Sequence, residues 1–425
     1  MLTIQYIREN TKEMIEALKV KNFDAQEISI KIIEADDKRR AVQKELDDIS
    51  AAANNLAKEI GALIKSGKTE QANAAKQQTN EYKEKSKELS KLLDDVNNEL
   101  HTLIVQIPNI PHASVPKGHS AADNLIVRKG NEGKFSKEGK VPHWEVTEKY
   151  DLIDFELGNK LTGAGFPVYK GKGAKLQRAL ISFFLDEAEA AGYLEVQPPI
   201  VVNEASGFGT GQLPDKEGQM YHVGIDNLYL IPTAEVPVTN IYRDVILKAE
   251  DFPIKNTAYT PCFRREAGSY GKDVRGLNRL HQFDKVEIVQ IEHPEKSYET
   301  LEKMVAHVES LVQKLGLEYR IVKLCGGDMS FTSALTYDFE VYAAGQDKWL
   351  EVSSVSNFEA YQANRLKLRY KEKGEKKTVL AHTLNGSALA LPRIVASILE
   401  GYQMPDGSIK IPDVLVPYTK FDSIS

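Results

Sequence analysis

The run TPCFRREAGSYGKDVRGLNRLHQFDKVE, residues 260–287, holds two stretches in which charged and aromatic side chains alternate with other residues. If FRRE (263–266) lies on a strand, Arg264 and Glu266 share one face and Arg265 points away, because side chains of a strand alternate between its faces. The odd-numbered positions of the second stretch share a face for the same reason: Arg279, His281, Phe283, Lys285 and Glu287. A hairpin of these two strands would gather arginines, glutamates and a phenylalanine on one sheet surface.

This surface has two interpretations: a solvated sheet face with charge pairs, or a nucleotide site. Phe283 favours the second, since an aromatic ring has no reason to lie among charges in water. A purine can stack on the ring, a glutamate can accept its exocyclic amine, and arginines can hold phosphate oxygens. The segment PTAE (232–235) has the same two-residue spacing as Arg264 and Glu266, because the Thr233 hydroxyl stands two residues before the Glu235 carboxylate.

Two further segments carry candidate site residues. Glu351 and Ser354, in WLEVSSVSNF, offer oxygen ligands of the kind that Mg²⁺ prefers and usually shares with phosphates. NGSALALPRIVASILEGYQ (385–403) predicts a helix that begins near Pro392 and presents Arg393 in its first turn. No GxxxxGK[ST] loop and no GxGxxG after a strand occurs, so the common phosphate-binding loops are absent.

The N-terminal quarter of the chain has a different pattern. Residues 26–103 contain no proline, and apolar residues recur there at steps of four and three: Val42, Leu46, Ile49, Ala53, Leu56, Ile60 and Leu63. This period of 3.5 predicts a long helix with a coiled-coil seam. KSGKT (65–69) predicts a break, and a second seam follows through Tyr82, Leu89, Leu92, Val96 and Leu103. Two such helices joined by a short turn should form an antiparallel hairpin.

The charge of this hairpin leaves two interpretations open. Residues 54–91 hold eight lysines and five glutamates, so the tip is mildly basic, whereas residues 27–53 and 92–100 are acidic. A packing or oligomerisation stalk needs no such polarity, but an arm that contacts phosphates would benefit from it. The candidate contacts to a nucleic acid are Lys58, Lys65, Lys68, Lys76 and Lys83.

The rest of the chain predicts a mixed domain. Short β-rich runs alternate irregularly with amphipathic helices. Strands are expected at 228–231, 286–290 and 339–341, and helices at 175–191 and 297–315. This irregularity favours a largely antiparallel sheet over a doubly wound parallel one. The expected fold class is α+β, with an N-terminal two-helix coiled coil at 1–104, a proline-containing linker at 105–115 and a catalytic-size domain at 116–425.

Composition narrows the class of protein. The 425 residues carry a formal net charge of −6, so the whole surface is not a basic nucleic-acid wrapper. Two cysteines, Cys262 and Cys325, exclude a disulfide framework and a Cys-rich zinc site. No apolar run reaches the ~20 residues needed to cross a bilayer, and no signal or transit peptide is evident. We expect a soluble cytoplasmic protein with no zinc and no membrane contact.

The motifs, in their order and spacing, resemble those of the bacterial-type seryl-tRNA synthetases, which belong to the second class of aminoacyl-tRNA synthetases. The resemblance covers nearly the whole chain, including the N-terminal hairpin. It rests on PNIPH (108–112), HWEV (143–146), GTGQLP (209–214), PTAEVP (232–237), FRREAGS (263–269), RGLNRLHQFDKVE (275–287), EVSSVSN (351–357), HTLNGSALALPR (382–393) and DGSIKIPDVLVPY (406–418). GYLEVQPP (192–199), FRRE and the segment ending in Arg393 are similar to the three class-defining motifs.

The resemblance implies a role for each matched residue. Arg264 and Arg393 would be the catalytic arginines, and Arg264 would hold both the serine carboxylate and the α-phosphate of ATP. The implied ATP site comprises Arg264, Arg265, Glu266, Arg279, Phe283, Glu351, Val352, Ser353, Ser354 and Arg393. The implied serine site comprises Thr233, Ala234, Glu235, Arg264, Glu287 and Ser387. Glu351 and Ser354 would ligate Mg²⁺.

The implied activity is ATP-dependent activation of L-serine to seryl-adenylate and its transfer to tRNA(Ser), and also to tRNA(Sec) where that exists. The implied partners include a tRNA with a long variable arm and a second copy of the chain, as a homodimer. The chain departs from the family pattern at Phe358, at Asn364 and at residues 216–219. Two alternatives are a synthetase-like ligase that charges a carrier protein, against which the long hairpin argues, and a catalytically inactive paralogue, against which the intact site residues argue.

Overall fold

The computed structural model describes residues 1–215, 217–266 and 275–425. The chain divides into two compact units. The smaller unit comprises Met1–Lys19 and Phe23–Pro108, and the larger comprises Val20–Asn22 and Asn109–Ser425. The three residues Val20–Asn22 therefore pack with the larger unit, although the chain on both sides of them belongs to the smaller one.

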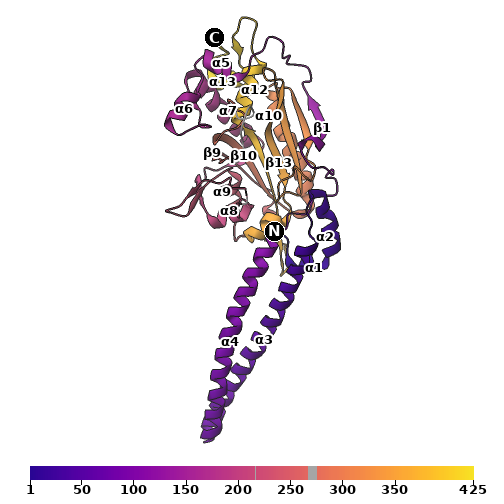
Figure 1. Cartoon of the computed structure of the whole chain (residues 1–425), viewed down its shortest axis with the longest axis vertical. Helices are drawn as coiled ribbons and strands as arrows, with labels where there is room; N and C mark the ends of the chain where they lie inside the picture. Colours follow the sequence, from indigo (N-terminus) through magenta and orange to yellow (C-terminus); the bar gives the residue numbers. More distant parts are fainter. Residues whose placement is uncertain (216, 267–274) are drawn as a thin grey trace. The chain divides into compact units, whose positions relative to one another are not determined.

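The smaller unit is helical (Figure 1). Two short helices, α1 (Ile4–Glu9) and α2 (Thr11–Leu18), precede two long ones, α3 (Gln26–Lys65) and α4 (Thr69–Ile104). The long helices pack against each other along their length as an antiparallel hairpin. The predicted hairpin, with its break at 65–69, is confirmed.

The seam between α3 and α4 follows the predicted spacing in α3 and departs from it once in α4. The side chains packed in it are Val42, Ile49 and Leu89, with Leu46, Tyr82 and Leu93 partly buried beside them. The prediction for Leu92 is wrong, because that side chain is 38% exposed. Steps of three and four residues alternate along this seam, so the step of four after Leu89 leads to Leu93 and the next step leads to Val96.

The larger unit is built on an eight-stranded sheet (Figure 1). Its order is β1 (Leu125–Gly130), β11 (Tyr319–Lys323), β12 (Leu335–Ala343), β13 (Lys348–Asn357), β16 (His382–Ala390), β10 (Gln282–Glu292), β9 (Ile254–Phe263) and β4 (Leu194–Glu195). All neighbouring pairs are antiparallel except β4 and β9. The predicted α+β class with a largely antiparallel sheet is confirmed.

Strand β10 lies between two hydrophobic cores. Its even positions Val286 and Ile288 enter the larger core with side chains of α7 (Gly171–Ala190), α10 (Ser297–Lys314) and α12 (Leu391–Gly401). On the opposite face, Val289 and Ile291 enter a smaller core with α9 (Glu235–Asn240) and α11 (Ala360–Leu366). Helices α9 and α11 thus cover one end of this second face, and the odd positions before residue 289 form the surface described below.

The remaining elements are short. The helices are α5 (His143–Lys149), α6 (Phe155–Leu161), α8 (Glu204–Thr210) and α13 (Val416–Thr419). The strands are β2 (Ile153–Asp154), β3 (Val168–Tyr169), β5 (Val201–Asn203), β6 (His222–Val223), β7 (Leu228–Leu230), β8 (Ile246–Lys248), β14 (Arg369–Lys371), β15 (Thr378–Leu380), β17 (Ile409–Lys410) and β18 (Ser423–Ile424). In the part of the chain that the structure describes, no helix has the length and apolar character needed to cross a membrane.

Candidate active site

The FRRE run leaves the sheet earlier than its alternation predicts. Strand β9 ends at Phe263, so the prediction of a strand through residue 266 is wrong. The backbone N–H of Arg264 still donates to the carbonyl of His281, at 2.9 Å, and this extends the β9–β10 pairing by one residue. The N–H of Arg265 turns to a carbonyl outside the hairpin, and Glu266 has a left-handed backbone with φ +49°. Strand alternation therefore reaches Arg264 and does not govern Glu266.

The second predicted strand begins later than expected. Strand β10 starts at Gln282, so Arg279 and His281 precede it. The ring of His281 stacks on Phe166, and its Nδ1 lies 2.8 Å from the Tyr221 hydroxyl. His281 is therefore held by packing. The connecting residues 267–274, including part of the FRREAGS motif, lie outside the described residues.

One end of the β10 face carries aromatic and basic groups. The Arg264 guanidinium lies 5.2 Å from the centre of the Phe283 ring, in a cation–π arrangement. Next to it, Arg279 forms an ion pair with the Glu266 carboxylate. The structure thus brings Arg264, Glu266, Arg279 and Phe283 together, although only Phe283 lies within the strands that were expected to carry them.

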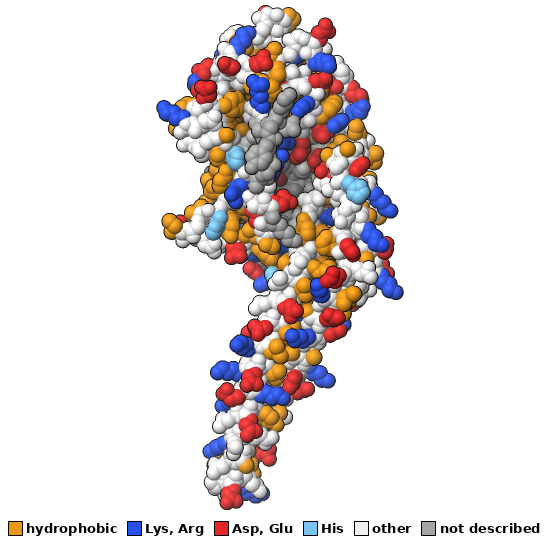
Figure 2. Space-filling model, in the orientation of Figure 1, with side chains coloured by type: hydrophobic (Ala, Val, Ile, Leu, Met, Phe, Trp, Pro, Cys, Tyr) orange, Lys and Arg blue, Asp and Glu red, His pale blue; other side chains and the backbone are white. Residues whose placement is uncertain are grey.

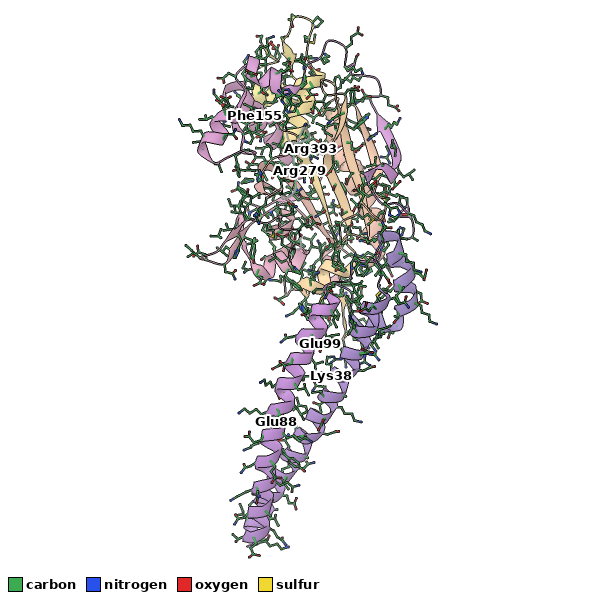
Figure 3. The ribbon with its side chains drawn as sticks, in the orientation of Figure 1. Lys38, Glu88, Glu99, Phe155, Arg279 and Arg393 are labelled. Atoms are coloured by element: carbon green, nitrogen blue, oxygen red, sulfur yellow. The ribbon has the colours of Figure 1, made fainter. Side chains whose placement is uncertain are left out.

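Arg393 joins this group from α12. Proline stands in the first turn of that helix, as predicted, and Arg393 directly follows it. Its Nε donates to the carbonyl of Asn278, at 3.0 Å, so Arg393 lies beside the segment that carries Arg279; Figure 3 labels both arginines in the larger unit. Its Nη1 donates to the Glu351 carbonyl at 2.7 Å and lies 3.8 Å from the Glu351 carboxylate. Arg393 therefore links the β10 face to β13.

An oxygen-rich group lies on β13 and its neighbour β12. The Ser354 hydroxyl donates to Asp338 Oδ1 at 2.6 Å, and the Glu351 carboxylate lies 3.5 Å from the same hydroxyl. Burial, and then the charge of Glu351, raises the pKa of Asp338 well above its usual range. A buried carboxyl of this kind is stabilised as a carboxylate by a nearby cation. Asp338 had no sequence signal of its own, because only the β12–β13 pairing brings it opposite Ser354.

The other end of the β10 face carries a buried polar cluster. Glu287 Oε2 accepts a hydrogen bond from the Thr233 hydroxyl at 3.0 Å and lies 2.6 Å from the Lys285 ammonium. Glu235 lies at the start of α9, and its Oε1 accepts from Gln362 Nε2 at 2.7 Å. Ser387 pairs with Glu287 across the β10–β16 ladder. Thr233, Glu235, Glu287 and Ser387 are all less than 9% exposed.

The charges of this cluster influence one another. Burial, and then the charge of Glu287, raises the pKa of Glu235 to about 7, whereas Gln362, Lys285 and Asn385 oppose that rise. Two carboxyl groups and one ammonium therefore share a space from which water is largely excluded. Such a site favours a ligand that brings a second ammonium group.

The other predicted site residues lie around these groups with their side chains directed elsewhere. Ala234 and Val352 are buried in the two cores. Ser353 donates its hydroxyl to the Ser387 carbonyl at 2.6 Å. Arg265 has an exposed side chain near Gly218. The lysines at 58, 65, 68, 76 and 83 belong to the smaller unit and are exposed along α3 and α4.

On the visible face of the larger unit, acidic and basic side chains lie side by side near the centre (Figure 2). Within the described ranges, no group of three or more His, Cys, Asp or Glu side chains is placed to hold a metal ion. The candidate cation ligands on β12 and β13 are two carboxyl groups and one hydroxyl. This oxygen set suits a hard cation that takes its other ligands from a phosphate.

Two family models match the chain. The seryl-tRNA synthetase N-terminal domain matches residues 1–111, and the tRNA synthetase class II core domain (G, H, P, S and T) matches residues 221–402. The serine–tRNA ligase of Salinibacter ruber is 49% identical over 424 residues, which cover 100% of this chain and 99% of that protein. The chain belongs to the seryl-tRNA synthetase family.

Other seryl-tRNA synthetases are similar over their full length. The serine–tRNA ligase of Geobacter sulfurreducens is 46% identical over 98% of both chains. The crystal structure of the seryl-tRNA synthetase from Pyrococcus horikoshii complexed with ATP has a TM-score of 0.90 and 33% identity, and the match covers 100% of this chain and 99% of that one. The resemblance inferred from the motifs is confirmed, and neither the carrier-protein ligase nor the inactive paralogue has support among these matches.

The departures from the synthetase family pattern differ in position, and one of them, Gln219, contacts the FRRE run, because its carbonyl accepts the Arg265 N–H at 2.8 Å. Phe358 is 4% exposed, and its backbone carbonyl accepts a hydrogen bond from Asn109 Nδ2 at 2.8 Å. Asn364 lies on α11, which covers the far end of the β10 face. Lys216 lies outside the described residues.

Proposed function

We propose that this chain activates L-serine with ATP to form seryl-adenylate and then transfers the seryl group to tRNA(Ser). The observation that carries the proposal is the continuity of one strand face. Three alternate residues of β10, Phe283, Lys285 and Glu287, follow one another along this face. Phe283 contacts Arg264, Lys285 contacts Glu287, and Glu287 also contacts Thr233. A nucleotide and a small amino acid bound at the two ends would meet between them, where the carboxylate must attack the α-phosphate.

The buried cluster is the proposed serine pocket. Glu235 and Thr233 would hold the ammonium group, while Glu287 and Ser387 would bind the hydroxyl, with Ala234 forming the wall between them. Alanine would leave the second oxygen of Glu287, Oε1, buried without a donor, which rejects alanine strongly, because a buried polar atom without a hydrogen bond is costly. Threonine would be rejected by size, which is a weaker effect.

The aromatic and basic group is the proposed ATP site. Phe283 and Arg393 would enclose the adenine ring, and Glu266 would accept its amine. Arg264 would hold the serine carboxylate and the α-phosphate in line, while Arg279 and Arg393 would hold the outer phosphates. Arg265, Val352 and Ser353 would contribute through their backbone, since their side chains point elsewhere. Catalysis would rest on preorganised positive charge and not on proton transfer.

The oxygen set on β12 and β13 fits Mg²⁺. Glu351 and Ser354 would be its ligands, with Asp338 behind Ser354. Bound Mg²⁺ would neutralise charge on the outer phosphates of ATP. Arg393 contacts Glu351 and so would hold this carboxylate in place beside the phosphates. Removal of Mg²⁺ should therefore stop exchange, while no zinc requirement is expected.

We propose that the hairpin binds tRNA. We divide the chain into a tRNA-binding hairpin at residues 1–104, a linker at 105–115 and a catalytic domain at 116–425. The exposed lysines at 58, 65, 68, 76 and 83 would contact phosphates, and the arm would recognise the shape of a long variable arm, because duplex RNA is poorly read by base sequence. The same recognition would extend to tRNA(Sec). We further propose a homodimer located in the cytoplasm.

The test of the proposed function is serine-dependent exchange between ATP and pyrophosphate. We expect exchange with L-serine and Mg²⁺ in the absence of tRNA, and charging of tRNA(Ser) when tRNA is added. Exchange supported by another amino acid and not by serine would overturn the proposal. Formation of an adenylate without any transfer to tRNA, but with transfer to a carrier protein, would favour the carrier-protein ligase.

A further inference from the structure

Lys285 is a buried ammonium group in the proposed serine pocket, and neither the motif comparison nor the proposed mechanism gives it a role. It is 6% exposed and lies on β10 between Phe283 and Glu287. Its Nζ is 2.6 Å from Glu287 Oε2. Burying a lysine costs free energy unless its charge is compensated, so this position requires the Glu287 carboxylate.

The contact places Glu287 in one orientation. Lys285 and the Thr233 hydroxyl both bind the same oxygen, Oε2. Among the described residues no side chain donates to the other oxygen, Oε1. The carboxylate is therefore held from one side, and Oε1 is the oxygen that can accept a hydrogen bond from a ligand hydroxyl.

Lys285 also brings a positive charge to a cluster that holds two carboxyl groups. The titratable groups that face the Glu287 carboxylate are Lys285 on its own strand, Glu235 at the start of α9 and Cys262 on β9. The side chains contributed by α11 and β16, which are Gln362, Asn385 and Ser387, do not titrate in this range. Without the ammonium, two buried carboxyl groups would adjoin each other, and the pKa of Glu235, which Lys285 lowers, would rise further.

We propose that Lys285 is a specificity-determining positioning residue, which holds the Glu287 carboxylate so that its Oε1 accepts a hydrogen bond from the hydroxyl of the substrate serine. This inference rests on the proposed function of the pocket. If Lys285 has this role, its replacement should weaken serine recognition more than ATP binding. A lysine that only stabilises the fold would affect serine recognition and ATP binding equally.

The test compares Lys285→Met with Lys285→Arg in the full-length chain. We expect Lys285→Met to raise the KM for serine at least about tenfold, with a change of less than about twofold in the KM for ATP. It should lower the preference for serine over threonine and alanine, and it should move the acidic limb of the pH profile of kcat/KM for serine to higher pH. Lys285→Arg keeps the positive charge and should show a smaller rise in the KM for serine, of about threefold, at an unchanged KM for ATP.

The chain offers a matched control. Lys303 makes an ion pair of the same length, 2.6 Å, with Glu299, but on the exposed side of α10. Lys303→Met should leave all four measurements unchanged. If the wild-type protein and Lys303→Met show no serine-dependent exchange, the proposed function fails. If both are active and Lys285→Met matches them in serine KM, specificity and pH profile, only the role of Lys285 fails.

If Lys285→Met does not fold, as judged by circular dichroism, Lys285→Arg decides the question. The bulkier guanidinium cannot occupy the same position relative to Oε2, so we expect a rise in serine KM of about threefold or more at unchanged ATP KM. Equal changes in both constants, or no change in either, would overturn the proposal.

Discussion

Arg264 and Arg265 are neighbours in the chain with different surroundings. Arg264 lies over the Phe283 ring, whereas the N–H of Arg265 binds outside the hairpin and its side chain is exposed. We expect Arg264→Ala to lower the rate of serine-dependent exchange by about 10²–10³-fold, the usual cost of removing a group that stabilises transition-state charge. Arg265→Ala should change the rate by less than about threefold. Equal losses in the two variants would contradict the assignment.

Glu235 makes serine binding depend on pH. Burial, and then the charge of Glu287, raises its pKa to about 7. Below that pH the proposed partner of the serine ammonium is neutral, and above it the partner is a carboxylate. The KM for serine should therefore fall as the pH rises through about 7, while the KM for ATP stays constant. A serine KM that is constant between pH 6 and pH 8 would show that Glu235 does not hold the ammonium.

The same shift affects stability, and its sign follows from linkage. The pKa of Glu235 is higher in the folded than in the unfolded protein, so its contribution is present at low pH and is lost as the pH rises toward about 7. Glu235→Gln removes this dependence and keeps the oxygen that accepts from Gln362. We expect the variant to gain in melting temperature over the wild type at pH 8 and to gain less at pH 5. If the difference in melting temperature between the variant and the wild type is the same at pH 5 and pH 8, Glu235 does not destabilise the folded protein by ionising.

Strand alternation predicted part of the site and failed where the chain left the sheet. It correctly grouped Phe283, Lys285 and Glu287, because the pairing of β10 with β9 is continuous there, although the ladder with β16 shifts between Lys285 and Glu287. It could not predict the position of Glu266, whose left-handed backbone is a local departure from the strand. Nor could it predict Asp338 and Gln362, because strand pairing and packing bring them to the site from distant parts of the sequence.

Among the elements, the hairpin was the most predictable. Heptad spacing is a local property, so the ends of α3 and α4 were located closely and only the step at Leu92 was misplaced. The sequence predicted that the sheet is largely antiparallel, but it did not predict the order of the strands within it. Strand β16 lies between β13 and β10, and this neighbourhood depends on contacts between residues far apart in the chain.

The hairpin and the catalytic core should separate in function. Replacing residues 26–103 by a short linker removes α3 and most of α4 but keeps Lys21, whose Nζ donates to carbonyls of Ser330 and Ser333 inside the larger unit. We expect this deletion to abolish charging of tRNA(Ser) and to leave serine-dependent exchange within about threefold of the full chain. The two activities are measured on the same preparation, so retained exchange confirms folding. Retained charging would refute the tRNA-binding role of the hairpin.

At the scale of the whole molecule, one edge strand of the large sheet, β4, is two residues long and exposes a leucine. Strand β4 pairs with β9 on one side only, and Leu194 on it is 67% exposed. An exposed edge strand with an apolar side chain is a natural place for a second copy to bind, and a two-fold axis would bring two identical edges together. This edge lies in GYLEVQPP, the segment that is similar to the motif found at the dimer interface of the class.

The edge provides a test of the proposed homodimer. We expect the wild-type chain to sediment at twice its mass of 47.5 kDa and Leu194→Glu to sediment as a monomer at micromolar concentration. Leu161, the last residue of α6, is 68% exposed and belongs to no strand of the large sheet, so Leu161→Glu adds the same charge at equal exposure and should remain dimeric. A monomeric wild type would refute the homodimer, and a dimeric Leu194→Glu would place its interface elsewhere. If the hairpin of one copy serves the tRNA charged by the other, the Leu194→Glu monomer should lose charging and keep exchange.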